Sequence, residues 1–356
     1  MTIQKYMTHG IDMLVSRGWN VQHATQAINH CMQHVLDCSW SEVFMSHEQL
    51  LDTAAQQNFL RILQRLVDEH KPLAYELGSM PFLGCDITIQ PPVLIPRQET
   101  ENWCSDVIAL IQSQENIQSQ EDRLEISTEK QIMQDPTAST CSNIGEKNNI
   151  FDAQRKQQNS AIDKDNNKNS TGKRSSTIHS DSKNLVIIDM CTGSGCIGIS
   201  LAKAMPDAQV YAADISSHAC GLAFGNAAHN KVSNISIIRS DMFGELMHLR
   251  GSVDYIVSNP PYVSYGEWLL VEPSVREWED YHALVAPDEG FLYIQAIIDH
   301  ARLFLRKRER VMPRVWIEIG AAQGERALLI AQMAGFEQSS ILQDLAGRAR
   351  VLQLVC

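Results

Sequence analysis

Residues 189–198, which read DMCTGSGCIG, decide the fold of this 356-residue chain. They contain the pattern G-x-G-x-x-G, which lets the backbone turn tightly and approach a ligand closely. An apolar strand is expected just before them, at 185–189, and an apolar helix after them, at 196–205. A strand, a glycine-rich turn and a helix in this order predict the first unit of an α/β sheet that binds a cofactor at the turn.

Two acidic residues near this turn indicate which cofactor it binds. Asp214 lies 19 residues after Gly195, at the end of the next expected strand, where an acid commonly binds the hydroxyl pair of a ribose. Asp189 ends the first strand, where its carboxylate would repel a pyrophosphate but suit the sulfonium and ammonium groups of S-adenosylmethionine. We therefore expect S-adenosylmethionine as the cofactor, with a nicotinamide dinucleotide as the alternative.

Other residues are expected to contact separate parts of this cofactor. Gly193 and Gly195 would let the backbone approach its methionine part. Asp241 follows the third expected strand and is placed to contact the adenine edge, with Met242 or Phe243 against the adenine face. A helix cap or an Asx turn is the alternative role for Asp241.

The sequence Asn259-Pro260-Pro261-Tyr262 follows another expected strand, at 253–257, where open α/β sheets bind ligands. The prolines fix φ and remove two N–H donors, and Asn259 is pushed to an extended conformation. The Asn259 side-chain oxygen and the Pro260 carbonyl would accept both hydrogens of a planar NH2 group, beside an aromatic wall from Tyr262. This arrangement suits methylation of an amide or an exocyclic amine, although Asn-Pro-Pro also occurs as simple turn chemistry.

Composition excludes several classes of protein. A hydrophobic content of 44% supports a core, and no apolar run is long enough to span a membrane. Nine cysteines without a C-x-x-C pair indicate a reduced intracellular protein. The net charge of −12 disfavours tight binding to long nucleic acids.

The chain divides into four parts. Residues 1–78 read as amphipathic helices and predict a small helical domain. A β-hairpin linker and the first helix of the catalytic domain are expected at 79–111. Residues 112–183 lack apolar periodicity and predict a disordered low-complexity insertion. In 184–356, strands and helices alternate, which predicts a parallel sheet with helices on both faces.

The glycine loop, Asp214, Asp241 and the Asn-Pro-Pro-Tyr sequence occur in the order found in class I methyltransferases that modify a planar nitrogen. Residues 93–101 read VLIPRQETE and resemble the LIPRPETE stretch of the HemK/PrmC family, the peptide chain release factor glutamine N5-methyltransferases. The similarity covers nearly everything except 112–183. It includes Pro72, Leu73, Ala74, Tyr75, Gly78, Phe82, Ala283, Leu284, Gly290, Asp344, Gly347, Arg350 and Val351.

The resemblance implies a Rossmann-like class I S-adenosylmethionine-dependent methyltransferase sheet with an N-terminal helical domain that binds a release factor. It implies methyl transfer to the side-chain nitrogen of the glutamine in the Gly-Gly-Gln loop of class I release factors. The expected cofactor-binding residues are Asp189, Cys191, Thr192, Gly193, Ser194, Gly195, Asp214, Asp241, Met242 and Asn259. The expected substrate-binding residues are Asn259, Pro260, Pro261, Tyr262, Arg97 and Glu99.

Asn259, Pro260 and Tyr262 are the expected catalytic residues, and no metal is required. The lone pair of an amide nitrogen is delocalised, which makes the nitrogen a poor nucleophile. The two acceptor oxygens, of Asn259 and Pro260, would therefore have to hold the substrate NH2 group for in-line attack on the methyl group. Arg97 and Glu99 would organise the cleft that admits the glutamine loop, or instead form a salt-bridged linker at a helix start. The chain departs from the family pattern at three positions, none of them in the amide clamp: Gln98, Met242 and Cys191 replace a proline, an aromatic residue and a glycine.

The resemblance implies a release factor as the protein partner, with no direct nucleic acid or membrane partner, and we expect a monomer. We expect the bacterial cytoplasm as its location, with the mitochondrial matrix as the alternative. The alternative activity is adenine-N6 or guanine-N2 methylation of nucleic acid, which would need a flipped base and a basic surface. A non-catalytic interaction module is the alternative from another class of protein.

Overall fold

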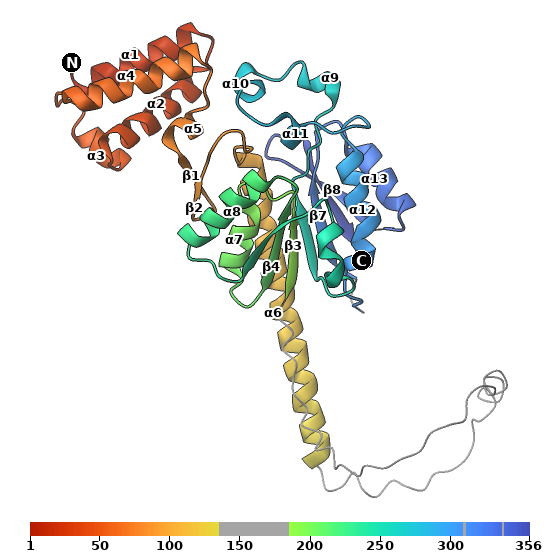
Figure 1. The fold of residues 1–356 in the computed structure, drawn as a ribbon. Helices are drawn as coiled ribbons and strands as arrows, with labels where there is room; N and C mark the ends of the chain where they lie inside the picture. The colour runs from red at the N-terminus through yellow and green to blue at the C-terminus, as the bar shows by residue number, and fades with distance from the viewer. Residues whose placement is uncertain (135–184, 309–310, 337) are drawn as a thin grey trace, which may run out of the picture. The chain divides into compact units, whose positions relative to one another are not determined.

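The computed structural model describes residues 1–134, 185–308, 311–336 and 338–356 (Figure 1). They form two compact units, of which the first joins Met1–Leu110 to Asn184–Cys356 and the second is Ile111–Lys183. None of the helices in the described ranges is both long and apolar enough to cross a lipid bilayer.

The first 78 residues form a bundle of short helices. Side chains of Thr2, Asn20, Ser39 and Asp52 cap the amino ends of the first four, because each accepts a hydrogen bond from a backbone N–H in the first turn. Apolar residues at helical spacing, such as Leu14, bury one face of each helix in a shared core. The helices are α1 (Ile3–Ser16), α2 (Val21–Leu36), α3 (Trp40–Met45), α4 (Thr53–Asp68) and α5 (Leu73–Leu77).

A two-stranded hairpin, β1 (Ser79–Phe82) and β2 (Cys85–Thr88), connects this bundle to the next helix along the chain. That helix, α6, spans Gln98–Gln134 and so continues into the range for which the sequence predicted disorder. Residues 112–134 contain many Gln and Glu and no Gly or Pro, a composition with high helix propensity. Residues 135–184 lie outside the described residues, and for them disorder stays a prediction.

Seven strands form the central sheet, in the order β5-β4-β3-β6-β7-β9-β8. The five strands from β5 to β7 are parallel, as predicted, but β9 runs antiparallel to both β7 and β8, so the sheet is mixed. The sequence predicted neither β8 nor the reversal. The connection 344–348 is too short for the crossover that a parallel pair requires. The strands are β3 (Val186–Met190), β4 (Gln209–Asp214), β5 (Ile235–Arg239), β6 (Tyr255–Ser258), β7 (Pro313–Glu318), β8 (Ser339–Gln343) and β9 (Ala349–Val355).

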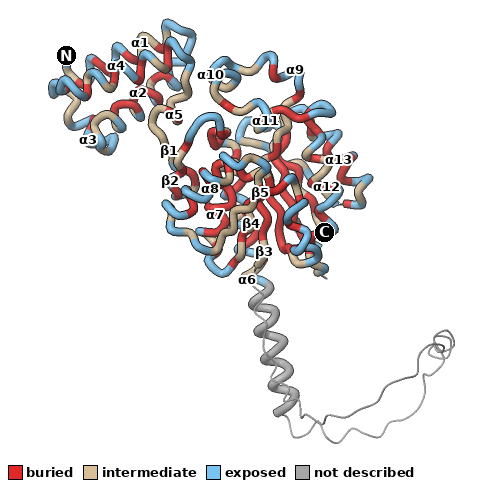
Figure 2. The backbone as a smooth tube through the Cα atoms, viewed as in Figure 1, coloured by how far each residue is buried: buried red, intermediate tan, exposed pale blue. Residues whose placement is uncertain are grey.

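Helices cover both faces of this sheet, as predicted, and the central strands β3, β6 and β7 are almost wholly buried (Figure 2). α7 (Cys196–Ala204) and α8 (Ser217–His229) pack on β3, β4 and β5, while α12 (Leu292–Phe304) and α13 (Gly324–Met333) share the main apolar core on the other side. Four short helices complete the domain: η2 (Gly244–Leu249), α9 (Tyr265–Trp268), α10 (Pro273–Arg276) and α11 (Tyr281–Leu284). The last three lie between β6 and α12 along the chain.

Candidate active site

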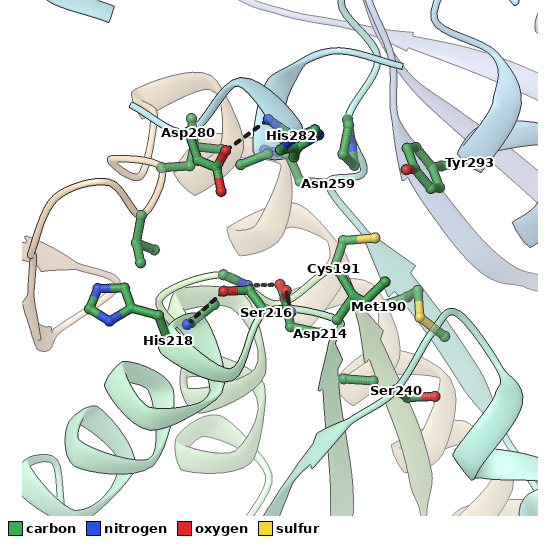
Figure 3. Close-up of a pocket in the computed structure, with 18 of the residues that line it drawn as sticks. Met190, Cys191, Asp214, Ser216, His218, Ser240, Asn259, Asp280, His282 and Tyr293 are labelled. Atoms are coloured by element: carbon green, nitrogen blue, oxygen red, sulfur yellow. Dashed lines mark hydrogen bonds between the residues drawn. The ribbon is translucent and has the colours of Figure 1, made fainter. Parts of the chain in front are cut away.

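A pocket lies at the carboxyl ends of β3, β4 and β6 (Figure 3). This is the edge where the strand order reverses from β4 to β6 around β3, the usual binding site in doubly wound sheets. The sequence predicted seven of the residues that line it: Cys191, Gly193, Asp214, Asp241, Met242, Asn259 and Pro261.

The glycine loop is held against the end of β4. The backbone N–H of Gly193 donates to Asp214 Oδ2 at 2.9 Å, and Thr192 N–H donates to the Ala213 carbonyl at 3.0 Å. Gly195 has φ of 84°, and a Cβ there would lie only 2.9 Å from Ile199 Cδ1, so the turn has room for glycine alone. Thr192, Ser194 and Gly195 therefore shape the loop without lining the pocket.

Asp214 combines this structural contact with exposure to the pocket. It also accepts the backbone N–H of Ser216 at 2.9 Å, so its carboxylate is already aligned at the end of β4. Burial raises the pKa of this carboxyl group above its ordinary value, and its backbone hydrogen bonds oppose that rise. Its position agrees with the expected contact to ribose hydroxyls.

Asp189 does not line the pocket, which differs from the expectation that it faces the cofactor. Its side chain is wholly buried behind the loop, where Oδ2 accepts the Thr192 hydroxyl at 2.5 Å and the Gly198 N–H at 2.8 Å. It therefore connects the glycine turn to the start of α7. The pocket instead owes its negative charge to three other carboxylates, Asp214, Asp241 and Asp280, and the described lining residues include no Lys or Arg. This charge suits a cationic cofactor.

We expect Asp189→Asn to change the pH dependence of stability but not cofactor affinity. Burial raises the pKa of Asp189 to about 7, whereas an unfolded Asp titrates near 4. The folded protein therefore binds this proton more tightly, and the stabilisation is lost as pH rises through about 7. Asparagine is neutral throughout, and its amide nitrogen can take the place of Asp189 Oδ1, which has no partner among the described residues.

Thermal unfolding of wild type and Asp189→Asn across pH, with calorimetric titration of the cofactor, tests this expectation. The melting temperature of the wild type should fall relative to that of the variant as pH rises from about 4 to about 8. Parallel pH profiles, or a loss of more than about tenfold in cofactor affinity (about 1.4 kcal/mol), would contradict the structural role.

Asp241 and Met242 lie in the turn after β5 and both line the pocket. The capping role that was the alternative for Asp241 is not seen, because η2 has no side-chain cap; the neighbouring Ser240 Oγ accepts the Glu245 N–H at 3.0 Å. Phe243 is buried and stacks on His300, with ring centroids 5.5 Å apart, so Met242 faces the pocket in its place.

Asn259 lines the pocket with its side chain held on one side only. Its Nδ2 donates to Thr100 Oγ1 at 3.2 Å. Neither Asn259 Oδ1 nor the Pro260 carbonyl receives a hydrogen bond from any residue in the described part of the chain. Asn259 Oδ1 is therefore available to a ligand in the pocket, whereas Pro260 is buried and does not line the pocket, so its role as the second acceptor stays a prediction.

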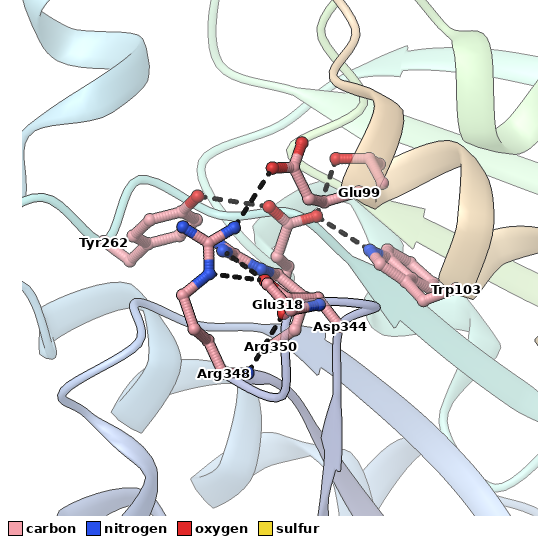
Figure 4. Close-up of polar contacts among 9 residues, drawn as sticks. Glu99, Trp103, Tyr262, Glu318, Asp344, Arg348 and Arg350 are labelled. Atoms are coloured by element: carbon pink, nitrogen blue, oxygen red, sulfur yellow. Dashed lines mark hydrogen bonds and ion pairs between the residues drawn. The ribbon is translucent and has the colours of Figure 1, made fainter.

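Tyr262 does not line the pocket, although the sequence predicted an aromatic wall there. Its hydroxyl donates to Glu318 Oε1 at 3.1 Å (Figure 4). Its carbonyl accepts the Gln323 side-chain amide at 2.9 Å. β6 and β7 are neighbouring parallel strands, so the loop after β6 passes the end of β7, where Glu318 lies. Tyr262 thus anchors this loop to the sheet.

Arg97 and Glu99 also lie outside the pocket wall. Arg97 forms a salt bridge with the buried carboxylate of Glu279, at 2.6 and 2.7 Å, and so holds the segment that continues into Asp280. Glu99 pairs with Arg348 at 3.5 Å on the surface. These contacts agree with the salt-bridged linker that was the alternative interpretation.

No sequence motif marked a second wall of the pocket. Asp280 and His282 lie on one side and Asp214 and Ser216 on the other (Figure 3). The segment carrying Asp280 reaches the pocket because its N–H donates to the Pro92 carbonyl at 2.8 Å. This pairing and the salt bridge between Arg97 and Glu279 both join the segment to residues far away in the sequence. The other lining residues that were missed are Val93, Leu94, Met190, Ala213, Ile215, His218, Ala219, Ser240, Ala283 and Tyr293.

Comparison with protein families finds two matches. Residues 6–78 match the PrmC N-terminal domain, and residues 176–271 match the methyltransferase small domain. The second range contains the glycine loop, Asp214, Asp241 and Asn259. The pocket and these matches indicate S-adenosylmethionine as the cofactor and leave no support for a nicotinamide.

Curated relatives cover the chain at modest identity. The bifunctional methyltransferase of Rickettsia typhi is 27% identical over 354 residues, which are 99% of this chain and 57% of that protein. The release factor glutamine methyltransferase of Chlamydia trachomatis serovar L2 is 26% identical over 345 residues, or 97% of this chain and 91% of that protein. The release factor glutamine methyltransferase of Thermodesulfovibrio yellowstonii is 32% identical over 168 residues, which are 47% of this chain and 58% of that protein.

The chain spans about half the length of the bifunctional relatives that it matches. Its bundle of helices and its sheet correspond in order to the two matched domains, and its pocket lies where the methyltransferase motifs meet. The chain thus combines a PrmC N-terminal domain with an S-adenosylmethionine-dependent methyltransferase domain, and it is similar to release factor glutamine methyltransferases over nearly its whole length.

Proposed function

We propose that the protein transfers a methyl group from S-adenosylmethionine to the side-chain amide nitrogen, N5, of the glutamine in the Gly-Gly-Gln motif of class I peptide chain release factors. The observation that carries this proposal is Asn259 Oδ1, which lies at the wall of the cofactor pocket and receives no hydrogen bond from the described residues; the neighbouring Pro260 carbonyl is the second acceptor that we propose. The names of the Chlamydia and Thermodesulfovibrio relatives support the same substrate.

The acceptor pair is suited to an uncharged carboxamide. One N–H of the glutamine side chain would donate to Asn259 Oδ1 and the other to the Pro260 carbonyl, which leaves the nitrogen lone pair directed away from both. Hydrogen bonds to both hydrogens favour a nitrogen that is less conjugated with its carbonyl, and this lowers the barrier to attack. S-adenosylmethionine, when bound, supplies an electrophilic methyl group on a sulfonium.

The remaining contribution of the protein is alignment. Two reactants held about 3–3.5 Å apart in line can supply roughly 7–11 kcal/mol of the barrier reduction. Pro260 and Pro261 restrict the backbone of the loop, and Tyr262 anchors it to Glu318, so the acceptors move little when substrate binds. After the transfer, the nitrogen loses its extra proton to water.

We propose that the enzyme acts as a monomer on the release factor in the bacterial cytoplasm, with no nucleic acid or membrane partner. The net charge of −12 and the acidic pocket support a protein substrate over a polyanion. The N-terminal helices would bind the release factor.

Mass spectrometry tests the proposed activity directly. Purified protein, S-adenosylmethionine and a class I release factor should yield a glutamine-bearing tryptic peptide heavier by one methylene group. A release factor in which that glutamine is replaced by glutamate is the matched control and should remain unmodified. Methyl transfer to RNA or DNA but not to the release factor would favour the alternative activity, and transfer to none of them would contradict both.

A further inference from the structure

We infer that Thr100 and Glu318 are positioning residues that hold the Asn259 side chain in the one orientation that presents its oxygen to the substrate. The inference rests on the proposed function, because the substrate it explains is an NH2 group. Thr100 lies in the first turn of α6 and Glu318 at the end of β7, so both act from outside the pocket wall.

Glu318 is a buried acceptor at the centre of a small network (Figure 4). Its Oε2 accepts the Thr100 hydroxyl and the Trp103 indole N–H, both at 2.7 Å. Its Oε1 accepts the Tyr262 hydroxyl at 3.1 Å. With Glu318 ionised, this carboxylate can only accept hydrogen bonds, so each of the three neighbours must act as a donor.

The direction of the Thr100 hydrogen bond decides the orientation of Asn259. A hydroxyl has a single hydrogen, and Thr100 gives it to Glu318. Toward Asn259 its oxygen can then only accept, so it pairs with the NH2 end of that amide at 3.2 Å. The Oδ1 of Asn259 is consequently directed to the other side, where it is available to a ligand.

The two ends of the Asn259 amide are nearly equivalent in shape, so without this pairing the side chain could adopt either orientation. A flipped amide would direct its own NH2 at the NH2 of the substrate, so two donors would face each other and one hydrogen bond would be lost. The network therefore selects a donor such as a glutamine amide. It disfavours a glutamate carboxylate, which would face the two acceptor oxygens.

Two variants that each remove one hydrogen bond to Glu318 Oε2 separate positioning from general stabilisation. Both Thr100 and Trp103 donate to that oxygen and both are buried, but only Thr100 contacts Asn259. We expect Thr100→Val to lower kcat on the release factor by about 10- to 100-fold, with cofactor affinity unchanged within about threefold. The matched control, Trp103→Phe, should keep kcat within about threefold of wild type even if its melting temperature falls by as much as that of Thr100→Val.

Thr100→Ser restores the hydroxyl and should recover most of the rate that valine loses. Equal loss of kcat in Thr100→Val and Trp103→Phe, or a Thr100→Ser variant as slow as Thr100→Val, would overturn the positioning role. Thr100→Ala serves as the second hydroxyl-free variant if valine prevents folding, and the same comparison applies to it.

A measurement without substrate keeps this inference separate from the proposed function. In proton–nitrogen NMR spectra of the full chain, the Asn259 side-chain NH2 signals are assigned by their disappearance in Asn259→Asp. We expect them to exchange slowly with water in the wild type and faster in Thr100→Val, whereas Trp103→Phe leaves them unchanged. Fast exchange in the wild type would overturn the inference. Failure to methylate a release factor, with the NMR result intact, would overturn only the assigned substrate.

Discussion

Replacing Asn259 with alanine is expected to lower kcat for methyl transfer by about 100-fold or more, because one of the two acceptors that we propose for the substrate NH2 group is lost. The alanine methyl group accepts no hydrogen bond, so the amide remains conjugated and poorly aligned. Asn259 lines the pocket but is not part of the apolar core. The melting temperature should therefore change little, and the loss in kcat should exceed any loss in affinity for S-adenosylmethionine.

Single-turnover rates with a release factor, together with calorimetric titration of the cofactor, measure both parts of this expectation. Asn259→Asp is the informative companion, because it keeps two acceptor oxygens of similar shape but cannot donate to Thr100. Its rate should fall between those of wild type and alanine. An alanine variant that keeps more than about a tenth of the wild-type rate would refute the assigned role.

Replacing Gly290 with alanine is expected to be the most disruptive substitution for the loop that carries the acceptors. Gly290 has φ of 85°, and an added Cβ would lie 2.0 Å from the Tyr262 carbonyl oxygen and 2.6 Å from Gln323 Nε2. Either the backbone after Pro261 must move or the hydrogen bond between Gln323 and Tyr262 must break. We expect a loss of about 3 kcal/mol or more in the free energy of unfolding, with a parallel loss of activity.

The control is Gly225→Ala on α8, where no atom lies within 4 Å of the added Cβ. Alanine favours a helix over glycine, so this variant should be unchanged or stabilised by up to about 1 kcal/mol. Thermal unfolding of both variants, with kcat on the release factor, compares them. A Gly290→Ala protein that melts within about 2 °C of wild type would show that the loop accommodates the methyl group.

Much of the fold follows from local patterns in the sequence. Strands β4 and β5 begin and end at the predicted residues, because alternating or continuous apolar residues between turn signals depend only on near neighbours. The glycine turn and the Asn-Pro-Pro sequence were placed correctly at the ends of β3 and β6 for the same reason. Backbone restrictions of Gly and Pro act within a few residues.

The predictions that the structure corrects concern where a side chain points, not where its residue lies along the chain. Asp189 and Tyr262 lie at the predicted strand ends, yet their side chains point to Gly198 and Glu318 instead of into the pocket. The side chain of a residue at or just after the end of a strand can point into the pocket or away from it. Packing of the neighbouring helix or strand decides which side it faces.

Residues and spacing alone were enough to place the glycine turn, Asp214 and the Asn-Pro-Pro sequence at the ends of β3, β4 and β6. Folding was needed to bring Thr100 to Glu318, 218 positions away, and so to orient Asn259. The reversed edge of the sheet and the second wall of the pocket likewise depend on pairing between distant segments. Local conformation depends on neighbours in the chain, whereas the direction of a buried hydrogen bond depends on partners that meet only in the packed protein.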